Sequence, residues 1–289
     1  MIFLENEQIC TSIASKGAEL QSLKSKKNNV NYLWNGNPEY WGKFSPVLFP
    51  IVGGLKNNTY YFEGKEYQLP RHGFARDKDF QVKQLSATEA LLTLSDDEES
   101  LKVYPFRFVL QLRYQLSDRA ISCTYEVLNP DNEKSMLFSI GGHPAFATST
   151  EGGLKYTDYF LQFNKDTELV YHKVKQDLID SETAVIELKE GKLPLNHALF
   201  YDDALVLKTL KSDCITLHNH KNKNGIHFRF KNFPFFGIWA AKNADFVCLE
   251  PWCGLADGTA HNQHIEHKEG IVTLGPNETF VRKWEVECF

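Results

Sequence analysis

Apolar and polar residues alternate along most of this chain, which is the pattern of half-buried β-strands. Such runs cover residues 106–116 and 119–128, and Ser117-Asp118 between them predicts a tight hairpin turn. Residues 59–69 form a second predicted hairpin, which turns at Glu63-Gly64. The same pattern predicts shorter strands at 89–94, 159–163, 214–218, 226–230 and 279–289. We therefore expect a chain built mainly from antiparallel strands.

Helical patterning is almost absent. Residues 96–105 predict one short helix, acidic at its start and ended by Pro105. No repeat, low-complexity tract or Pro/Ser-rich linker interrupts the chain. The fold expected is all-β: one large antiparallel β-sandwich domain spanning residues 1–289. About 20 strands exceed the capacity of a small barrel, so stacked sheets are expected.

Composition and charge narrow the function classes. With 289 residues the chain is long enough to bury a sizeable core, and its formal net charge of −5 argues against a nucleic-acid partner. No run approaches the roughly 18 apolar residues of a membrane span. The N-terminus lacks the basic and apolar regions of a signal peptide. Six scattered cysteines without a CxxC pair are expected to be reduced thiols. These features predict a cytoplasmic location and no membrane partner.

Several well-known catalytic and cofactor motifs are missing. The sequence contains no GxGxxG or Walker loop, no GxSxG elbow and no HExxH. His261, His264 and His267 have a metal-like spacing, but no convincing helix carries them and no carboxylate or cysteine cluster completes a site. We interpret them as solvated loop histidines. No metal or cofactor is expected.

Three segments combine an ionisable residue with a glycine- or proline-containing turn. They are LPRHGFARD at 69–77, GGHPAF at 141–146 and CLEPWCGLAD at 248–257. Each is predicted to end an apolar strand, present His72, His143 or Glu250, and then turn sharply. Taken singly, each residue has a structural interpretation, such as a buried hydrogen bond or a loop cap. Together with Arg71 they form a general acid–base set that lacks a covalent nucleophile.

At these segments the chain resembles the aldose 1-epimerase, or galactose mutarotase-like, family, and within it the LacX-type branch. The similarity runs nearly end to end, and it includes GAELQSLKS at 17–25 and YPFRFVLQLRYQL at 104–116. The resemblance implies a β-supersandwich with an open, sugar-binding concave face. It also implies that His143 and Glu250 are catalytic, that His72 orients the substrate, and that Asp203 binds it.

Two arginines bear on which sugar would bind. Where the galactose-specific branch carries an arginine after a glycine-rich strand, this chain has Lys56, and Arg71 is the candidate to replace it. The stretch HGFAR is similar to the phosphosugar branch, which makes Arg76 a candidate phosphate ligand. The alternative is that Arg76 only pairs with Asp77 or Asp79. Lys56, Arg71 and Arg76 together predict a basic entrance to the site.

The expected reaction is exchange of the α and β anomers of a hexose or hexose phosphate. Glu250 would take a proton from the C1 hydroxyl while His143 delivers one to the ring oxygen. Arg71 would keep Glu250 ionised, and the carboxylate would raise the pKa of His143. Two alternatives remain: a non-catalytic sugar-binding or regulatory protein on the same fold, and a glycosidase, which needs two flanking carboxylates.

Overall fold

The computed structural model describes residues 1–148 and 153–289, and within these ranges the chain is mostly β-strand. The alternating pattern therefore predicted the class of fold correctly. The strands form a nine-stranded sheet, an eight-stranded sheet and three small sheets. The long ladders of both large sheets are antiparallel.

The nine-stranded sheet joins segments that are far apart in the sequence. In spatial order it consists of β17 (Lys192–Pro194), β14 (Tyr159–Phe163), β19 (Cys214–Asn219), β20 (Ile226–Arg229), β24 (Thr279–Cys288), β10 (Ala120–Leu128), β9 (Val109–Ser117), β8 (Glu89–Ser95) and β7 (Gln81–Gln84). The predicted hairpin between β9 and β10 is present, but Ser117 pairs with Ala120, so its turn lies one residue later than predicted. Asp118 in that turn has a φ of 50°.

The eight-stranded sheet carries the predicted site residue Glu250 within one strand, and His143 directly follows the neighbouring strand. It consists of β16 (Leu178–Glu187), β15 (Glu168–Lys175), β18 (Leu205–Leu207), β21 (Phe235–Trp239), β22 (Phe246–Cys253), β12 (Ile140–Gly142) and β4 (Val47–Leu48), with β13 (Ala145–Ala147) also paired to β22. Every residue of β22 is buried. Such a strand, covered on both faces, reads as a continuous apolar run rather than an alternating one.

The remaining elements are short. The small sheets contain β1 (Ile2–Glu5), β2 (Ile9–Ile13) and β3 (Leu20–Ser25), then β5 (Thr59–Phe62) with β6 (Lys65–Gln68), and β11 (Met136–Phe138) with β23 (Val272–Leu274). The predicted helix is α1 (Glu98–Val103), which begins with a capping box between Asp97 and Ser100. The predicted 59–69 hairpin is β5–β6, with positive φ at Glu63 and Gly64. Short 3₁₀ turns occupy 56–58, 75–77, 156–158, 197–200 and 265–267.

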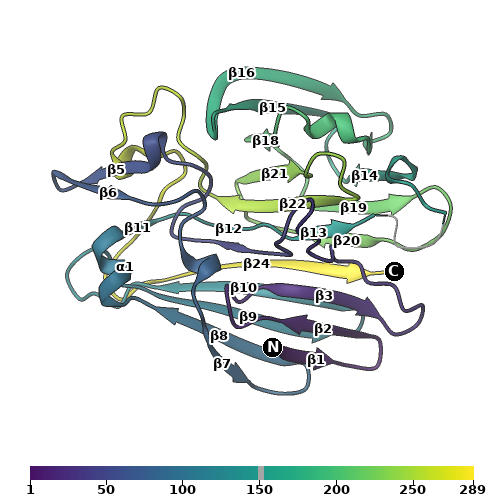
Figure 1. The fold of residues 1–289 in the computed structure, drawn as a ribbon, viewed down its shortest axis with the longest axis horizontal. Helices are drawn as coiled ribbons and strands as arrows, with labels where there is room; N and C mark the ends of the chain where they lie inside the picture. The colour runs from purple at the N-terminus through teal and green to yellow at the C-terminus, as the bar shows by residue number, and fades with distance from the viewer. Residues whose placement is uncertain (149–152) are drawn as a thin grey trace.

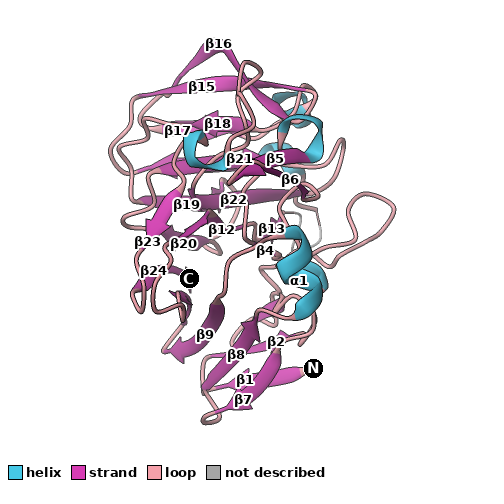
Figure 2. Ribbon diagram, turned by 90° about the vertical axis from the view of Figure 1, so that its left-hand side faces the viewer, coloured by secondary structure: helices cyan, strands magenta, loops and turns pink. Residues whose placement is uncertain are grey.

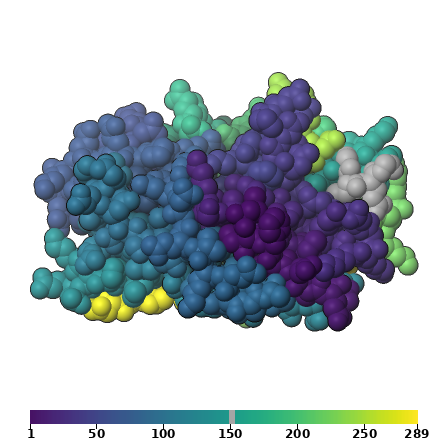
Figure 3. Space-filling view, turned by 60° about the horizontal axis from the view of Figure 1, so that its bottom comes forward, coloured from purple at the N-terminus to yellow at the C-terminus, as the bar shows by residue number. Residues whose placement is uncertain are grey.

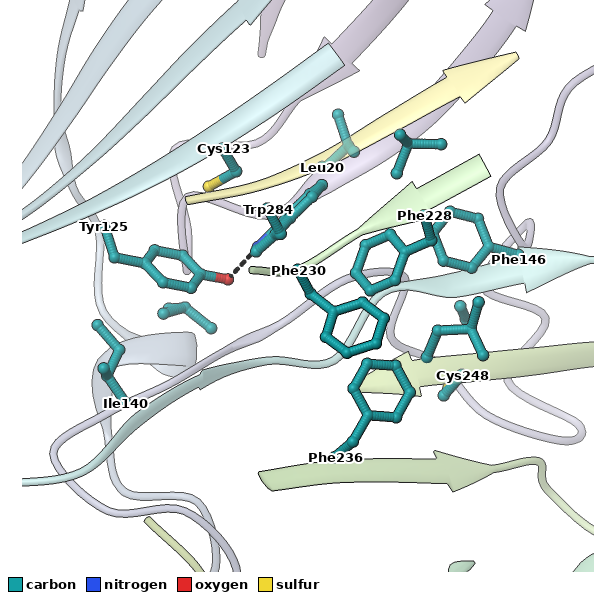
Figure 4. Packing of buried hydrophobic residues seen from close by; sticks show 14 of the residues in the cluster. Leu20, Cys123, Tyr125, Ile140, Phe146, Phe228, Phe230, Phe236, Cys248 and Trp284 are labelled. Carbon is teal, nitrogen blue, oxygen red and sulfur yellow. Dashed lines mark hydrogen bonds between the residues drawn. The ribbon is translucent and has the colours of Figure 1, made fainter. Parts of the chain in front are cut away.

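The two large sheets stack and share an aromatic core. In Figures 1 and 2, β16, β15, β18, β21 and β22 of the eight-stranded sheet lie at the top, and β9, β8 and β7 of the nine-stranded sheet lie below them. Between them, the rings of Phe230 and Phe236 have centroids 4.2 Å apart. Trp284 Nε1 donates a hydrogen bond of 2.7 Å to Tyr125 Oη, drawn as a dashed line in Figure 4. This buried pair lies against the strand that precedes His143.

The glycine pair before His143 leaves room for aromatic side chains on both faces of β12. A Cβ on Gly141 would lie 2.6 Å from the indole ring of Trp252. A Cβ on Gly142 would lie 2.6 Å from Tyr125 Oη and 3.1 Å from Trp284 Nε1. No side chain fits at either position without moving these rings. Core packing therefore sets the position of the backbone that presents His143.

The N-terminal strand covers one end of the nine-stranded sheet. The Glu5 N–H donates to the Ala87 carbonyl, and Gln84 Nε2 donates to the Phe3 carbonyl. Figure 3 shows this purple segment packed against the blue residues of that end. Within residues 1–148 and 153–289, we find no helix of sufficient length and hydrophobicity to span a membrane.

We expect Gly142→Ala to lower the free energy of unfolding by about 1–3 kcal/mol, because the new methyl group overpacks the Tyr125–Trp284 pair. Urea unfolding measures this change. Gly258→Ala is the matched control: its nearest neighbour would be the Ile179 carbonyl oxygen at 3.8 Å, so a change within about 0.5 kcal/mol is expected. Equal effects of the two substitutions would contradict the packing argument.

Candidate active site

A cleft of ≈ 370 Å³ opens over the eight-stranded sheet. Three tryptophans, Trp41, Trp239 and Trp252, form part of its wall. All six predicted site residues also line it, namely Arg71, His72, Arg76, His143, Asp203 and Glu250. The structure thus brings together side chains from segments up to about 180 residues apart in the sequence.

Glu250 lies inside β22, and the prediction that it ends a strand before a turn was wrong. The prediction relied on Pro251, which cannot donate a ladder hydrogen bond. The Leu249 N–H donates to the Pro144 carbonyl, so it points toward β12 and β13. The nitrogen of Pro251, two residues on, points the same way, into the gap in the ladder between these two short strands. The proline therefore does not interrupt the sheet.

His143 and Glu250 meet on the floor of the cleft. His143 Nε2 lies 3.3 Å from Glu250 Oε2, and the two side chains are 9% and 2% exposed. The His143 ring stacks on Trp41 at a centroid distance of 4.9 Å, and the edge of Trp239 lies 5.7 Å away. The His143 N–H is bonded to the Pro46 carbonyl. Ring stacking and backbone bonding together fix the direction of the imidazole.

Burial controls the protonation of this pair. Burial, followed by the positive charge of Arg71, lowers the pKa of His143 to about 3. Burial also raises the pKa of Glu250 well above 4.5, with Arg71 opposing the rise and Asp203 adding to it. The expected effects, an ionised Glu250 and a raised pKa for His143, are therefore reversed. Desolvation of both groups outweighs their mutual attraction. The pair favours a neutral imidazole beside a protonated carboxyl.

His72 sits beside His143 in a strained backbone position. Its φ is 68°, a left-handed value that is uncommon for a non-glycine residue. The two imidazole rings are 5.7 Å apart and nearly perpendicular. The Gly53 N–H donates to His72 Nδ1 at 3.1 Å, so the backbone of the neighbouring turn orients the ring. Burial, followed by the charge of His143, lowers the pKa of His72.

The arginines and Asp203 line the cleft above this floor. Arg71 Nη1 pairs with Asp177 Oδ1 at 2.5 Å, and Arg71 Nε donates a hydrogen bond of 3.3 Å to His72 Nε2. Arg76 Nη2 donates to the Arg71 carbonyl at 2.9 Å. Arg76 Nε forms an ion pair of 3.7 Å with Asp77, which confirms the predicted pairing, but this buried nitrogen has no hydrogen-bond partner. Asp203 has a φ of 109°, a second strained backbone position in the cleft.

A buried ion pair behind the cleft wall was missed from the sequence. Lys268 Nζ donates to Asp257 Oδ1 at 2.9 Å, and neither side chain is exposed. Asp257 also accepts the Lys56 N–H, and its own N–H bonds to the Gly54 carbonyl. It therefore fixes the turn that begins at Gly53, whose N–H orients His72. No local motif marks a lysine and an aspartate eleven residues apart as partners.

The predicted basic entrance lacks Lys56. The Lys56 amino group donates to the His261 carbonyl at 3.2 Å and does not line the cleft. Its position is explained by the bond between its own N–H and Asp257, which turns the side chain toward the 261 loop. The entrance is formed instead by Arg71, Arg76 and the carboxylate of Asp177.

The three C-terminal histidines do not form a metal cluster. His264 and His267 are exposed, as predicted, but His261 is only 12% exposed and lies 3.3 Å from the Asp257 carboxylate. The solvated interpretation was therefore wrong for His261. Over the described ranges, one group of side chains has donor atoms close enough to hold a metal ion: His143, Cys248 and Glu250.

Comparisons with known proteins identify relatives along the full chain. The family model for aldose 1-epimerase matches residues 1–283. The plasmid-encoded protein LacX of Lactococcus lactis subsp. lactis is 31% identical over 294 residues, which cover 99% of this chain and 98% of that protein.

Two solved structures share the fold closely. A galactose mutarotase related enzyme from Lactobacillus acidophilus has a TM-score of 0.95 and 34% identity, covering 100% of this chain and 97% of the other. A galactose mutarotase-like protein from Lactobacillus casei has a TM-score of 0.91 and 30% identity, covering 100% of both chains. The predicted galactose mutarotase-like fold is confirmed.

Glu250→Gln should stabilise the protein at neutral and alkaline pH. The folded-state pKa of Glu250 is raised, so its stabilising contribution is present below the unfolded-state value of about 4.5 and is lost as the pH rises through the folded-state pKa. Glutamine does not titrate. The advantage of the variant in unfolding free energy should therefore grow by about 1.4 kcal/mol for each pH unit within that window.

Urea unfolding at a series of pH values measures this difference. Glu7→Gln, which removes an exposed carboxylate, is the matched control. An advantage of Glu250→Gln that stays constant from acid to alkaline pH would contradict the burial argument.

Proposed function

We propose that this chain, which belongs to the aldose 1-epimerase family, is a mutarotase that interconverts the α and β anomers of an aldohexose. Residues 1–283 match the family, which supports an isomerase-type activity, and the solved relatives are described as galactose mutarotase-like or related proteins. The finer assignment, in which Glu250 is the base and His143 the acid, rests on the geometry of the cleft floor.

One observation carries the proposal: the 3.3 Å separation between His143 Nε2 and Glu250 Oε2 at the base of a cleft large enough for a sugar ring. Anomer exchange needs a proton removed from the C1 hydroxyl and a proton delivered to the ring oxygen. These two oxygens share the C1 carbon, so an acid and a base side by side can reach both. General acid and base steps contribute about 10²–10⁴ each.

In the proposed cycle the pair carries one proton. With that proton on His143, Glu250 accepts the O1 proton while His143 protonates the ring oxygen and the C1–O5 bond breaks. The aldehyde rotates about the C1–C2 bond, and the same transfers in reverse close the ring on either face. Burial favours the proton on Glu250 in the free protein. Transfer to His143 therefore precedes ring opening, and the two pKa values belong to the pair as a unit.

The other cleft residues would position the sugar. His72, which lines the cleft beside His143, would form a hydrogen bond with the ring oxygen or the developing aldehyde. Asp203 and Arg71 would bind ring hydroxyl groups. Trp41 and Trp239 offer apolar ring surfaces beside the acid–base pair, a surface on which sugars commonly stack.

A hexose phosphate is the second candidate substrate, because of Arg76. Its buried Nε has no hydrogen-bond partner, and the side chain reaches the cleft while remaining 24% exposed. A buried guanidinium donor without a partner is costly, and a phosphate oxygen would satisfy it.

Glu250→Gln and His143→Asn should each lower kcat by about 10² or more, while sugar affinity changes much less. The double variant should be little worse than the worse single variant, since the two groups serve one ring-opening event. Anomer-exchange NMR over a panel of free and phosphorylated hexoses measures this. His261→Asn, which alters a mostly buried histidine outside the cleft, is the matched control.

A wild-type protein that binds a hexose but leaves every anomer exchange at the uncatalysed rate would refute the enzymatic assignment. It would favour a non-catalytic sugar-binding protein on this fold. The same substitutions would then change affinity alone.

Arg76→Ala distinguishes the two substrate classes. If the substrate is a hexose phosphate, kcat/KM for phosphosugars should fall by about 10-fold or more relative to free sugars, because a charge-assisted bond is lost. Arg113→Ala, which removes an arginine paired with Glu89 in the nine-stranded sheet, is the control. Equal losses for both sugar classes would mean that Arg76 is structural.

A further inference from the structure

We infer that His143, Cys248 and Glu250 form a binding site for a soft divalent cation such as Zn²⁺, and that its occupancy blocks the acid–base pair. Cation binding stands independently of the proposed function. The consequence for turnover rests on that function, and the experiment below separates the two.

The donor atoms already lie near the geometry of a zinc site. One donor atom from each residue lies within 4.8 Å of the others, and His143 Nε2 and Glu250 Oε2 are 3.3 Å apart. In a tetrahedral zinc site with bonds of about 2.0–2.3 Å, ligand atoms are about 3.3–3.7 Å apart. The distance between His143 Nε2 and Glu250 Oε2 therefore already suits a zinc site. A pair of donor atoms at the 4.8 Å limit would have to approach by about 1 Å.

The sheet places the thiol beneath the pair. Cys248 and Glu250 are two residues apart on β22, so both side chains project from the same face. Cys248 is fully buried and does not line the cleft, whereas His143 and Glu250 do. A cation held by all three would have its fourth position directed toward the cleft, where water or a sugar hydroxyl can bind.

The ligand set matches the chemistry of zinc. Imidazole nitrogen, thiolate sulfur and carboxylate oxygen are its usual protein donors. On binding, the thiol releases its proton to solvent as the metal–sulfur bond forms, and the carboxyl releases any proton it holds. The imidazole of His143 binds metal in its neutral form, through the Nε2 lone pair.

Such a cation would inhibit rather than assist the acid–base pair. It would occupy the Nε2 and Oε2 lone pairs that exchange protons with the sugar. His143 Nδ1 is buried without a hydrogen-bond partner. A ligating histidine normally donates from its second nitrogen, and loss of such a partner costs about 10–100-fold in metal affinity. Binding should therefore be weaker than at structural zinc sites, and reversible.

The experiment titrates the full chain with Cd²⁺, which gives an ultraviolet charge-transfer band when it binds a thiolate. We expect one Cd²⁺ per chain, displaced by Zn²⁺. Cys248→Ser should lose the band. Cys253→Ser, which removes a buried thiol from the opposite face of the same strand, should keep it. His143→Asn, which removes a second ligand, should weaken Cd²⁺ binding by about tenfold or more.

Absence of the band in the wild type would overturn the inference. Persistence of the band in Cys248→Ser would also overturn it, since the cation would then bind another thiol. If Cys248→Ser does not fold, unchanged Cd²⁺ affinity in His143→Asn decides against the site. In the wild type, Zn²⁺ should inhibit anomer exchange at the concentrations that displace Cd²⁺. Zn²⁺ binding without inhibition would overturn the blocking role of the cation. A cadmium band on a chain with no exchange activity would support the cation site, and it would count only against the proposed function.

Discussion

Burial of the Glu250 carboxyl at the floor of the cleft is the constraint on which the candidate site depends. An isolated carboxylate at this depth would be strongly destabilising. Its close neighbour is His143 at 3.3 Å, and burial lowers the pKa of this imidazole while it raises the pKa of the carboxyl. The glycine pair before His143 and the stacked Trp41 ring hold the imidazole in reach of the carboxyl. The packing of the core therefore determines the distance between the imidazole and the carboxyl.

Local sequence signals predicted the local structure well. The Glu63-Gly64 hairpin and the helix capped by Asp97 are encoded by residues that suit one backbone conformation. The predicted strand ended before Pro251, whereas β22 continues to Cys253. The effect of a proline on a strand depends on which neighbouring strand its nitrogen faces. That neighbour is about a hundred residues away in the sequence. Sheet order, such as the pairing of β24 with β10, has no local signature at all.

The candidate site was predictable wherever an ionisable residue stands in a distinctive turn or motif. His72, His143 and Glu250 were found in this way, and all three line the cleft. Asp177 and the Asp257–Lys268 pair were missed, since each is an ordinary charged residue until the fold gives it a partner. The protonation of the pair was predicted in the wrong direction for a related reason. Charge complementarity is readable from residue types, whereas the extent of desolvation is set by the whole fold.

The framework of the cleft and its rim come from different parts of the chain. Glu250 and the backbone of His143 are held by β22, β12 and the Tyr125–Trp284 pair in the core. Arg71 and Asp177 lie in turns at the rim, and Asp203 lies in a loop there. Natural selection can therefore alter the rim without disturbing the floor. A substitution in one of these rim loops would remodel the entrance of the cleft at little cost in folding, whereas a substitution at the floor would also disturb the core.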